Sequence, residues 1–288
     1  MNIQGTSAVV TGAANGIGRA IAIELAARGV NVVVVDLEIE PAKNVATEIT
    51  ASGGSAVAIE ADVTQPSALT KVAEDAWRSF GSIELLFNNA GVLPGRASIF
   101  ESTPENARWI FSVNVEGVIN GIREFLPRFI ESGKNAYVVN TGSEHSLGVP
   151  HTGAGLYTAS KHAILGLSDV LRREVPDHIG VGVLCPGLVQ STLWRSEERR
   201  LDEHATTAVD PVRGKFSESF GMPASEVAQR VLSGIEQDAF LIPTHAHVID
   251  YAQDRAREIE LAFEQQAPRY DGDEKYDVEK LVTRLTKN

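Results

Sequence analysis

The sequence predicts an α/β protein built on an open, parallel, doubly wound sheet. Apolar runs alternate with stretches of helical periodicity from the N-terminus to residue 187, and only short links join them. The run at residues 30–35 is continuously apolar and rich in β-branched side chains, as in a strand covered on both faces. A glycine-rich turn at residues 11–18 connects the first apolar run to the first helical stretch.

Each element is predicted from its local pattern. Strands are expected where short apolar runs end in turn residues, at 7–10, 30–35, 55–61, 83–87, 136–140, 180–184 and 239–243. Helices are expected where apolar residues recur every three or four positions, at 17–28, 41–52, 67–80, 105–132, 156–174, 224–237 and 248–266. Pro41 and Pro104 stand near two of these helix starts, where a missing amide proton is tolerated.

The same reading divides the chain into a main domain and an extension. No linker or change in composition interrupts the first part, and one domain is expected over residues 1–245. The irregular, charged segment 188–222 follows a strand end and is expected to form a lid over the substrate. Residues 246–288 are expected to be a helical extension rather than an independent domain.

Composition narrows the possible functions. The chain has 288 residues, 43% of them hydrophobic, and a formal net charge of -12, so it has material for a large core and no basic stripe for nucleic acid. Cys185 is the single cysteine, which excludes an internal disulfide and fits a reducing compartment. Neither a leader nor an apolar run of about 18 residues is apparent. A cytoplasmic protein without a membrane partner is expected.

The turn at residues 11–18 has the features of a dinucleotide phosphate loop. Glycines between a strand and a helix let the backbone approach a ligand, and the helix start offers amide groups to a pyrophosphate. The glycine spacing differs from the commoner pattern, but the strand-to-helix context supports the assignment. The residues expected to bind the cofactor here are Gly12, Asn15, Gly16, Ile17 and Gly18.

Polar residues at the next strand ends extend this prediction. Asp36 could accept both ribose hydroxyls of NAD and would repel the 2′-phosphate of NADP, and Leu37 supplies no compensating cation. NAD is therefore the expected cofactor. Asp62, with Val63, could bind the adenine, although a helix cap or turn is an equally good interpretation. A cofactor-binding strand end or a plain turn is expected at Asn88, Asn89, Ala90 and Gly91.

Tyr157 and Lys161 lie four positions apart on one predicted helix and should share a face. A neighbouring ammonium favours the phenolate form and would lower the pKa of the tyrosine, which makes the pair a plausible acid/base unit. Taken alone the spacing is weak evidence, since an exposed tyrosine beside a solvated lysine is commoner.

Taken together, these motifs resemble the short-chain dehydrogenase/reductase family of the single-domain kind. The resemblance covers about residues 5–245 and rests on the glycine loop, Asp62, Asn88 to Gly91, and the pieces Asn114, Ser143, Tyr157, Lys161 and Pro186-Gly187 in the family's order. It implies a Rossmann-like three-layer α/β/α sandwich with a sheet of about seven strands. The first 245 residues would then be both the NAD-binding and the catalytic domain.

The resemblance also implies a role for each tetrad residue. Tyr157 would exchange the proton of the substrate oxygen, and Lys161 would lower the tyrosine pKa and bind the nicotinamide ribose. Ser143 would orient the substrate oxygen, with Ser146 a less suitable candidate. Asn114, inside a long helix, would hold a relay water, and a local irregularity is expected because asparagine favours helices poorly. The nicotinamide contacts implied are Pro186, Gly187, Val189 and Thr192.

The expected substrate pocket lies at the carboxyl ends of the strands and is mainly apolar. Its candidate residues are Leu93, His145, Leu147, Leu156, Leu193 and Trp194. Glu144 and His145 could equally be a surface loop pair, and Trp194 could pack within the lid. Cys185 is expected to be a core residue. His245 and His247 are not expected to bind a metal, because no carboxylate or cysteine near them in the sequence completes a ligand set.

The function expected is therefore an NAD(H)-dependent interconversion of a secondary alcohol and a ketone. The substrate should be a hydrophobic small molecule that is aromatic, alicyclic, steroid-like or acyl. A homo-oligomer, tetramer or dimer, is expected from the family. The alternative is a catalytically silent NAD-binding sensor or scaffold, which the intact Tyr157 and Lys161 disfavour. A sugar-nucleotide epimerase would need a larger C-terminal substrate domain and another glycine spacing.

Overall fold

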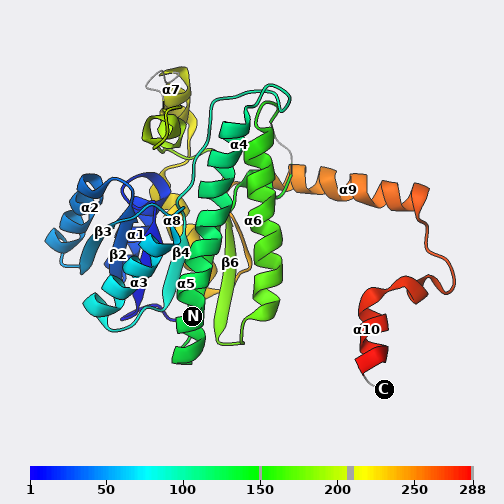
Figure 1. The fold of residues 1–288 in the computed structure, drawn as a ribbon, viewed down its shortest axis with the longest axis horizontal. Coiled ribbons are helices and arrows are strands. Elements are labelled where there is room, and N and C mark those ends of the chain that lie inside the picture. The colour runs from blue at the N-terminus through cyan, green and yellow to red at the C-terminus, as the bar shows by residue number, and fades with distance from the viewer. Residues whose placement is uncertain (149–150, 206–210, 287–288) are drawn as a thin grey trace.

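A computed structural model describes residues 1–148, 151–205 and 211–286, and within them seven parallel strands form one sheet in the order β3-β2-β1-β4-β5-β6-β7 (Figure 1). The expected doubly wound sheet is confirmed. The strands are β1 (Ser7–Thr11), β2 (Asn31–Asp36), β3 (Ala56–Glu60), β4 (Leu85–Asn88), β5 (Ala136–Thr141), β6 (Ile179–Cys185) and β7 (Leu241–Pro243).

Helices cover both faces of the sheet because the central strands are apolar on both sides. On one face the buried side chains of α1, α2 and α8 form a core with strand residues such as Val10 and Val34. On the other face α3 and α5 contribute Leu69, Phe125 and Phe129. These helices are α1 (Gly16–Ala27), α2 (Ile39–Ala51), α3 (Pro66–Phe80), α5 (Gly117–Ser132) and α8 (Ala224–Glu236).

The helix expected over residues 105–132 is divided by a π-helical turn. α4 (Pro104–Phe111) leads into the π turn η1 (Ser112–Glu116), and α5 follows directly. The Thr103 hydroxyl accepts a hydrogen bond from the amide of Asn106 at 3.2 Å and caps α4. α6 (Gly155–Glu174) lies beside this composite helix (Figure 1).

The order of the strands places the candidate site. The chain moves outward from β1 to β2 and β3, then returns to β4 on the other side of β1. At such a reversal the loops after β1 and β4 are expected to leave in opposite directions, and in open α/β sheets this is where a ligand crevice forms, at the carboxyl ends of the strands. The glycine loop and the segment after Asn88 therefore lie side by side, and the Thr11 hydroxyl donates to the Phe87 carbonyl at 3.2 Å.

The segment 188–222, which is expected to form a lid and is called the lid below, is more regular than its sequence suggests. It contains the 3₁₀ segment η3 (Leu193–Arg199) and α7 (Pro211–Phe220), so the expectation of an irregular segment is corrected; residues 206–210 of the lid lie outside the described residues. Helical periodicity is weak in α7 because Gly214 and several polar residues interrupt its apolar positions.

The C-terminal extension begins with α9 (Val248–Gln266), whose bounds the sequence predicted. α9 extends away from the sheet, and from its far end the chain turns downward in this view, through the short 3₁₀ turn η4 (Asp273–Tyr276), to α10 (Val278–Thr286), which lies below α9 (Figure 1). The sequence reading did not anticipate α10, and residues 287–288 of the extension lie outside the described residues.

Candidate active site

The glycine loop is packed too closely for any larger residue at two positions. A Cβ atom on Gly18 would lie 2.2 Å from the carbonyl oxygen of Gly12, and one on Gly12 would lie 2.8 Å from the Cα atom of Ala90. Gly12 and Gly16 also have positive φ angles of 63° and 55°. The loop is thus in close contact with the segment that follows β4. The helix α1 starts within the loop, and the first amide groups of a helix have no hydrogen-bond partners inside that helix.

Side-chain amides hold the strand ends beneath this loop. The Asn89 amide donates to the carbonyl oxygens of Thr11 and Gly12, at 3.0 and 3.2 Å. Asn88 donates to Asn140 at 2.9 Å, and Asn140 in turn donates to the Ser168 hydroxyl at 3.0 Å. This chain ties β4 and β5 to α6, the helix of the predicted acid/base pair, and so fixes its position relative to the glycine loop.

Asp36 lies at the end of β2 with its carboxylate turned toward the glycine loop. It accepts hydrogen bonds from the amides of Ala14 at 2.9 Å and Glu38 at 3.2 Å. Burial raises the pKa of this carboxyl, and the two backbone bonds and the positive charge of Arg199 partly oppose the rise. The local sequence showed no cation near Asp36. Arg199 supplies one from the lid, where it forms an ion pair with Glu38.

Asp62 and Val63 follow β3. The Asp62 carboxylate accepts from the Thr64 amide at 2.9 Å, which is the turn geometry considered for it. Val63 is buried against Gly117, whose added Cβ would lie 2.8 Å from the Val63 side chain. The Val63 carbonyl accepts from Asn120 at 2.9 Å. Packing on α5 therefore fixes this strand end beside the crevice.

Tyr157 and Lys161 are both buried on the inner face of α6, next to Ser143 at the end of β5. The Ser143 side chain lies beside the Tyr157 hydroxyl, and this contact favours a lower tyrosine pKa. Lys161 Nζ donates to the carbonyl oxygen of Thr141 at 2.8 Å and lies 5.7 Å from the centre of the Tyr157 ring. The three residues that the resemblance joins are therefore brought together in the structure.

Burial dominates the protonation of this pair. It raises the pKa of Tyr157 to about 12, although the bond from Ser143 opposes the rise. It also lowers the pKa of Lys161 to about 8. The expected net lowering of the tyrosine pKa by Lys161 is therefore wrong for this structure. The sequence showed the spacing of the pair but not how deeply both groups are buried.

Asn114 occupies the π turn η1, so the expected irregularity in this helix is confirmed. Its side chain is fully engaged: the oxygen accepts from the Val92 amide at 2.8 Å, and the amide group donates to the Val92 carbonyl at 3.0 Å and to Ser160 at 3.1 Å. A Cβ atom on Gly91 would lie 3.3 Å from the Asn114 oxygen and 3.6 Å from Lys161 Nζ. Asn114 therefore joins three segments around the lysine.

The two serines after β5 have different partners. The Ser146 hydroxyl donates to the Lys161 carbonyl at 2.7 Å and accepts from the Ser143 amide at 3.1 Å, so it is committed to the backbone. The Ser143 hydroxyl donates a long hydrogen bond to the Pro186 carbonyl at 3.5 Å and also contacts Tyr157. This difference agrees with the choice of Ser143 as the substrate-orienting serine.

The segment after β6 connects the lid to the glycine loop. The Pro186 carbonyl accepts from the Glu144 amide at 2.8 Å, and the Gly187 amide donates to His245 at 3.1 Å. Val189 is buried, and its carbonyl accepts from Ser217 in α7 at 2.9 Å. The Thr192 hydroxyl donates to Asn15 at 2.6 Å. A residue proposed to contact the nicotinamide and a residue of the proposed pyrophosphate loop thus meet.

The predicted pocket residues divide between the site and the lid. His145 is buried with its ring edge-on to Tyr157, the centres being 5.2 Å apart, and burial lowers its pKa to about 4. Leu147 packs against a core cluster with Val118 and Ile164. Trp194 packs on α7, since a Cβ atom on Gly214 would lie 2.6 Å from its ring. The lid-packing interpretation of Trp194 therefore fits better.

The remaining pocket candidates are Leu93, Leu193 and Leu156, and the contacts seen among the described residues do not join them to Tyr157. The Leu93 amide donates to Ser196 of the lid at 3.1 Å, and the carbonyl of Leu193 accepts from the same serine. Leu156 is half-buried at the start of α6. Cys185 is buried, as expected, and its thiol has a pKa raised to about 12 by burial.

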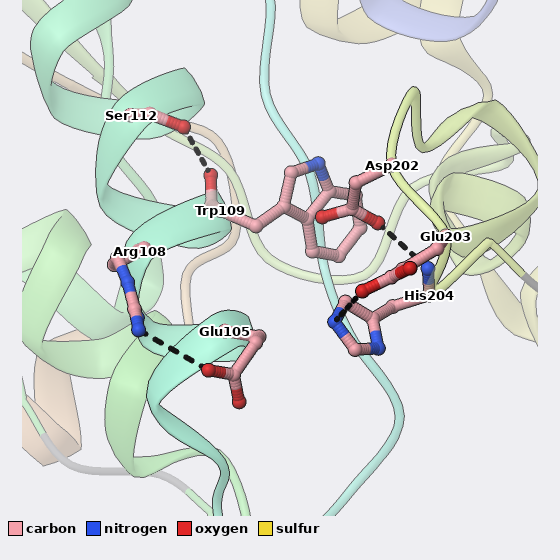
Figure 2. A pocket seen from close by; sticks show the side chains of 7 residues that line it. All are labelled: Glu105, Arg108, Trp109, Ser112, Asp202, Glu203 and His204. Carbon is pink, nitrogen blue, oxygen red and sulfur yellow. Dashed lines mark hydrogen bonds and ion pairs between the residues drawn. The ribbon is translucent and has the colours of Figure 1, made fainter.

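One hollow lies away from the tetrad, between α4 and the lid (Figure 2). Trp109 forms its floor, with the guanidinium of Arg200 4.9 Å from the ring centre. Glu105 and Arg108 pair with each other along one side, and His204 lies near Glu203 on the other. None of the residues that line this hollow is among those predicted from the sequence as site residues, and the candidate site does not include it.

The sequence reasoning missed one group of side chains beside the site. Glu144 Oε2 lies 3.4 Å from His247 Nε2, and Glu144 Oε1 lies 3.5 Å from His151 Nε2. The statement that no carboxylate completes a set near His247 holds only along the sequence and is wrong in space. The only signal was the Glu-His pair directly after Ser143.

Among the described residues, no helix is both long enough and apolar enough to cross a lipid bilayer.

Comparisons with known proteins agree with this architecture. The family profile described as short chain dehydrogenase matches residues 6–202. A 1-deoxy-11-beta-hydroxypentalenate dehydrogenase of Streptomyces exfoliatus is 37% identical over 77% of this chain and 82% of its own length. A cyclohexanol dehydrogenase of Acinetobacter sp. (strain SE19) is 34% identical over 85% of this chain and 93% of its own.

A solved structure gives the same result in three dimensions. It is a short chain dehydrogenase/reductase from Burkholderia phymatum in complex with NAD, 30% identical in sequence. The two structures superpose with a TM-score of 0.84 and cover 94% of this chain and 98% of that one. The match extends beyond the profile into the C-terminal part of the chain.

Proposed function

Because this chain belongs to the short-chain dehydrogenase family of oxidoreductases, we propose that it interconverts a secondary alcohol and a ketone with NAD(H). The observation that carries the proposal is the buried Tyr157, whose hydroxyl contacts Ser143 and whose ring centre lies 5.7 Å from Lys161 Nζ. Residues 1–245 would form the catalytic domain, with 188–222 as its lid.

The crevice has the features that a dinucleotide requires. The close-packed glycines bring backbone amides to the start of α1, where a pyrophosphate would bind. Asp36 lies at the end of β2, where its carboxylate would accept the hydroxyls of the adenosine ribose. The nicotinamide would supply or accept the hydride. Pro186, Gly187, Val189 and Thr192 would position its ring, with Thr192 exchanging its Asn15 contact for the carboxamide.

The protein's own residues would handle the proton. Ser143 would hold the substrate oxygen, and the Tyr157 hydroxyl would give that oxygen a proton during ketone reduction or take one during alcohol oxidation. Lys161 would bind the ribose and keep a positive charge near the phenol. The side chain of Asn114 is occupied by Val92 and Ser160, so its backbone carbonyl is the atom proposed to hold a relay water.

The proposed substrate is a hydrophobic alcohol, alicyclic, aromatic or acyl. Leu93, Leu156 and the ring of His145 would border it, and two relatives carry names of dehydrogenases that act on cyclic alcohols. Oxidation of cyclic, aromatic and long-chain secondary alcohols, each with NAD and NADP, can be followed by absorbance of the reduced cofactor. NAD-linked turnover is expected with at least the cyclic class. NAD binding without turnover of any alcohol would instead favour the silent NAD-binding alternative.

We also propose that the protein is a homo-oligomer, and that the α9 arm takes part in its assembly. Ile249, Ile259 and Phe263 are spaced to lie on one face of α9, and each is about half exposed or more. A second copy of this chain is the proposed partner, because an arm that extends from the body cannot bury this face against its own sheet (Figure 1).

A further inference from the structure

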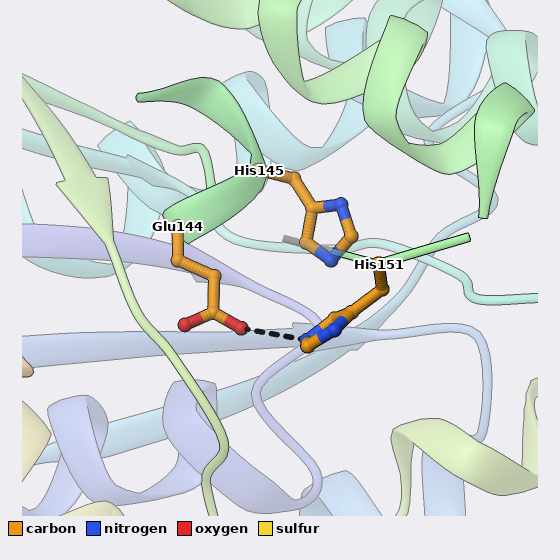
Figure 3. Close-up of side chains that lie close together, drawn as sticks. All are labelled: Glu144, His145 and His151. Atoms are coloured by element: carbon orange, nitrogen blue, oxygen red, sulfur yellow. Dashed lines mark ion pairs between the residues drawn. The ribbon is translucent and has the colours of Figure 1, made fainter. Parts of the chain in front are cut away.

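Three potential metal ligands converge directly after the candidate catalytic serine (Figure 3). Glu144 and His145 are consecutive in the 3₁₀ turn η2 (Glu144–Ser146), and His151 comes from the loop that leads into α6. One ligand atom from each residue lies within 4.8 Å of the corresponding atoms of the other two. Two imidazoles and one carboxylate form a donor set that binds transition metals in many proteins.

His145 is oriented as metal-binding histidines usually are. Its Nδ1 atom lies 2.7 Å from the Thr158 hydroxyl in α6, so an Nδ1 proton can be donated to that oxygen. The Nε2 atom then keeps its lone pair for a ligand. A hydrogen bond to the second ring nitrogen is the arrangement that fixes the tautomer and the ring direction of metal-bound histidines.

Glu144 is buried, yet both of its oxygens face histidines. Oε1 lies 3.5 Å from His151 Nε2, and Oε2 lies 3.4 Å from His247 Nε2, just before α9. A buried carboxylate is costly unless it is paired or binds a cation. A shared metal ion would satisfy it, and His247 is placed to become a further ligand.

We propose that Glu144, His145 and His151 bind a divalent transition metal ion such as Zn²⁺, with His247 within reach as a fourth ligand. Imidazole nitrogens disfavour Mg²⁺ and Ca²⁺, which take oxygen ligands. Zinc bonds of about 2.0–2.2 Å need the ligand atoms closer together than they are here. The exposed His151 and His247 side chains supply that movement, while Glu144 and His145 are held by their surroundings.

The site is accessible and adjoins Tyr157. A hollow lined by His151, Thr158 and Ile99 lies beside it and offers an entry path. The His145 ring contacts the Tyr157 ring edge-on, so a bound cation would lie close to the phenol and favour its ionised form. The proposal concerns binding and does not depend on the proposed oxidoreductase activity.

Metal binding can be measured directly on the full chain. CoCl₂ is titrated against the visible absorption of bound Co²⁺, and ZnCl₂ is titrated by calorimetry. We expect one Co²⁺ per chain, displaced by Zn²⁺, and a loss of affinity of roughly tenfold or more in His151→Ala and Glu144→Gln. The control is His204→Ala, which removes a partly exposed histidine 3.9 Å from Glu203 on the lid and should bind like the wild type.

A second pair of variants separates ligation from general damage to the fold. Thr158→Val removes the acceptor for His145 Nδ1 and should weaken Co²⁺ binding about 10- to 100-fold, whereas Thr158→Ser should retain it. Unfolding temperatures verify that each variant is folded. The proposal is overturned if the wild type shows no saturable Co²⁺ or Zn²⁺ binding, or if His151→Ala binds with wild-type affinity.

Discussion

Arg199 of the lid forms an ion pair with Glu38, two residues after the Asp36 carboxylate that ends β2. The same guanidinium donates to the Thr192 hydroxyl at 3.0 Å, and Thr192 donates to Asn15 of the glycine loop. The Arg199 side chain thus connects the lid to the segment after β2 directly, and to the glycine loop through Thr192. The positive charge that could receive a 2′-phosphate is engaged by Glu38, so under the proposed function Asp36 is expected to decide between NAD and NADP.

Removing the Asp36 carboxylate should weaken the preference for NAD. In Asp36→Ser, kcat/KM with NAD should fall roughly 10- to 100-fold, because a charged hydrogen bond to the ribose is lost. The value with NADP should fall less or rise, because repulsion of the 2′-phosphate disappears. The control is Glu40→Gln, which changes an exposed carboxylate that pairs with Lys43 in α2, the helix that follows β2. Equal losses with both cofactors would contradict this role.

The glycine loop should tolerate no added methyl group at Gly18. Gly18→Ala places a Cβ atom against the Gly12 carbonyl and should cost about 1–3 kcal/mol of unfolding free energy, together with NAD affinity. Gly166→Ala, in α6, meets nothing within 4 Å and should stabilise the protein by about 0.5–1 kcal/mol. Urea unfolding and NAD titration of both variants test the contrast, and a harmless Gly18→Ala would refute the close packing.

The pH dependence of stability should reveal the buried Lys161 charge. Burial lowers its pKa from 10.5 in the unfolded chain to about 8 in the folded protein. Between these values the unfolded state binds more protons, so the folded state gains stability as the pH rises. Relative to Lys161→Met, the wild type should gain about 3 kcal/mol of unfolding free energy between pH 7 and pH 11. A constant difference across this range would show that the lysine is not desolvated.

The α9 arm should be needed for assembly. In the double variant Ile259→Glu with Phe263→Glu, two charges replace exposed apolar side chains on one helix face, and burying them against a second copy would be unfavourable. A smaller particle is expected in light scattering coupled to size exclusion. Asp254→Lys, on the opposite face of the same helix, should leave the particle size unchanged. An unaltered size in the double variant would exclude this face as an interface.

Much of the fold could be predicted because it follows from two local sequence patterns, continuous apolar runs and helical periodicity. Continuous apolar runs such as 30–35 are typical of buried parallel strands, and the helical stretches between them fix the crossover connections. α7 and α10 escaped prediction: glycine and polar residues weaken the periodicity of α7, and α10 is a short helix at the end of an acidic tail. The π turn at Asn114 was expected only as an irregularity, since its form depends on contacts with Val92 and Ser160.

The parts of the site that lie within one sequence motif could be predicted. The parts formed by residues that are far apart in the sequence could not. Tyr157 and Lys161 are one helical turn apart, so their shared face follows from sequence. The approach of Arg199 to Glu38, and of His247 to Glu144, joins residues far apart in the chain. The protonation of Tyr157 was also misjudged, because burial depends on the whole fold rather than on the neighbouring lysine.

The most direct test of the proposed function compares two buried tyrosines. Tyr157→Phe keeps the ring but removes the hydroxyl that contacts Ser143, and Tyr137→Phe removes a hydroxyl that donates to the Ala239 carbonyl at 2.9 Å. The Tyr137 variant should lose about 1 kcal/mol of stability and keep its turnover.

The decisive measurement is the rate of NAD-linked alcohol oxidation in Tyr157→Phe, with NAD affinity determined on the same sample. We predict a fall in kcat of at least about 10²-fold with NAD binding retained, because the proton then has no acceptor at the substrate oxygen. Turnover at the wild-type rate in this variant would contradict the assignment of Tyr157 as the acid/base residue.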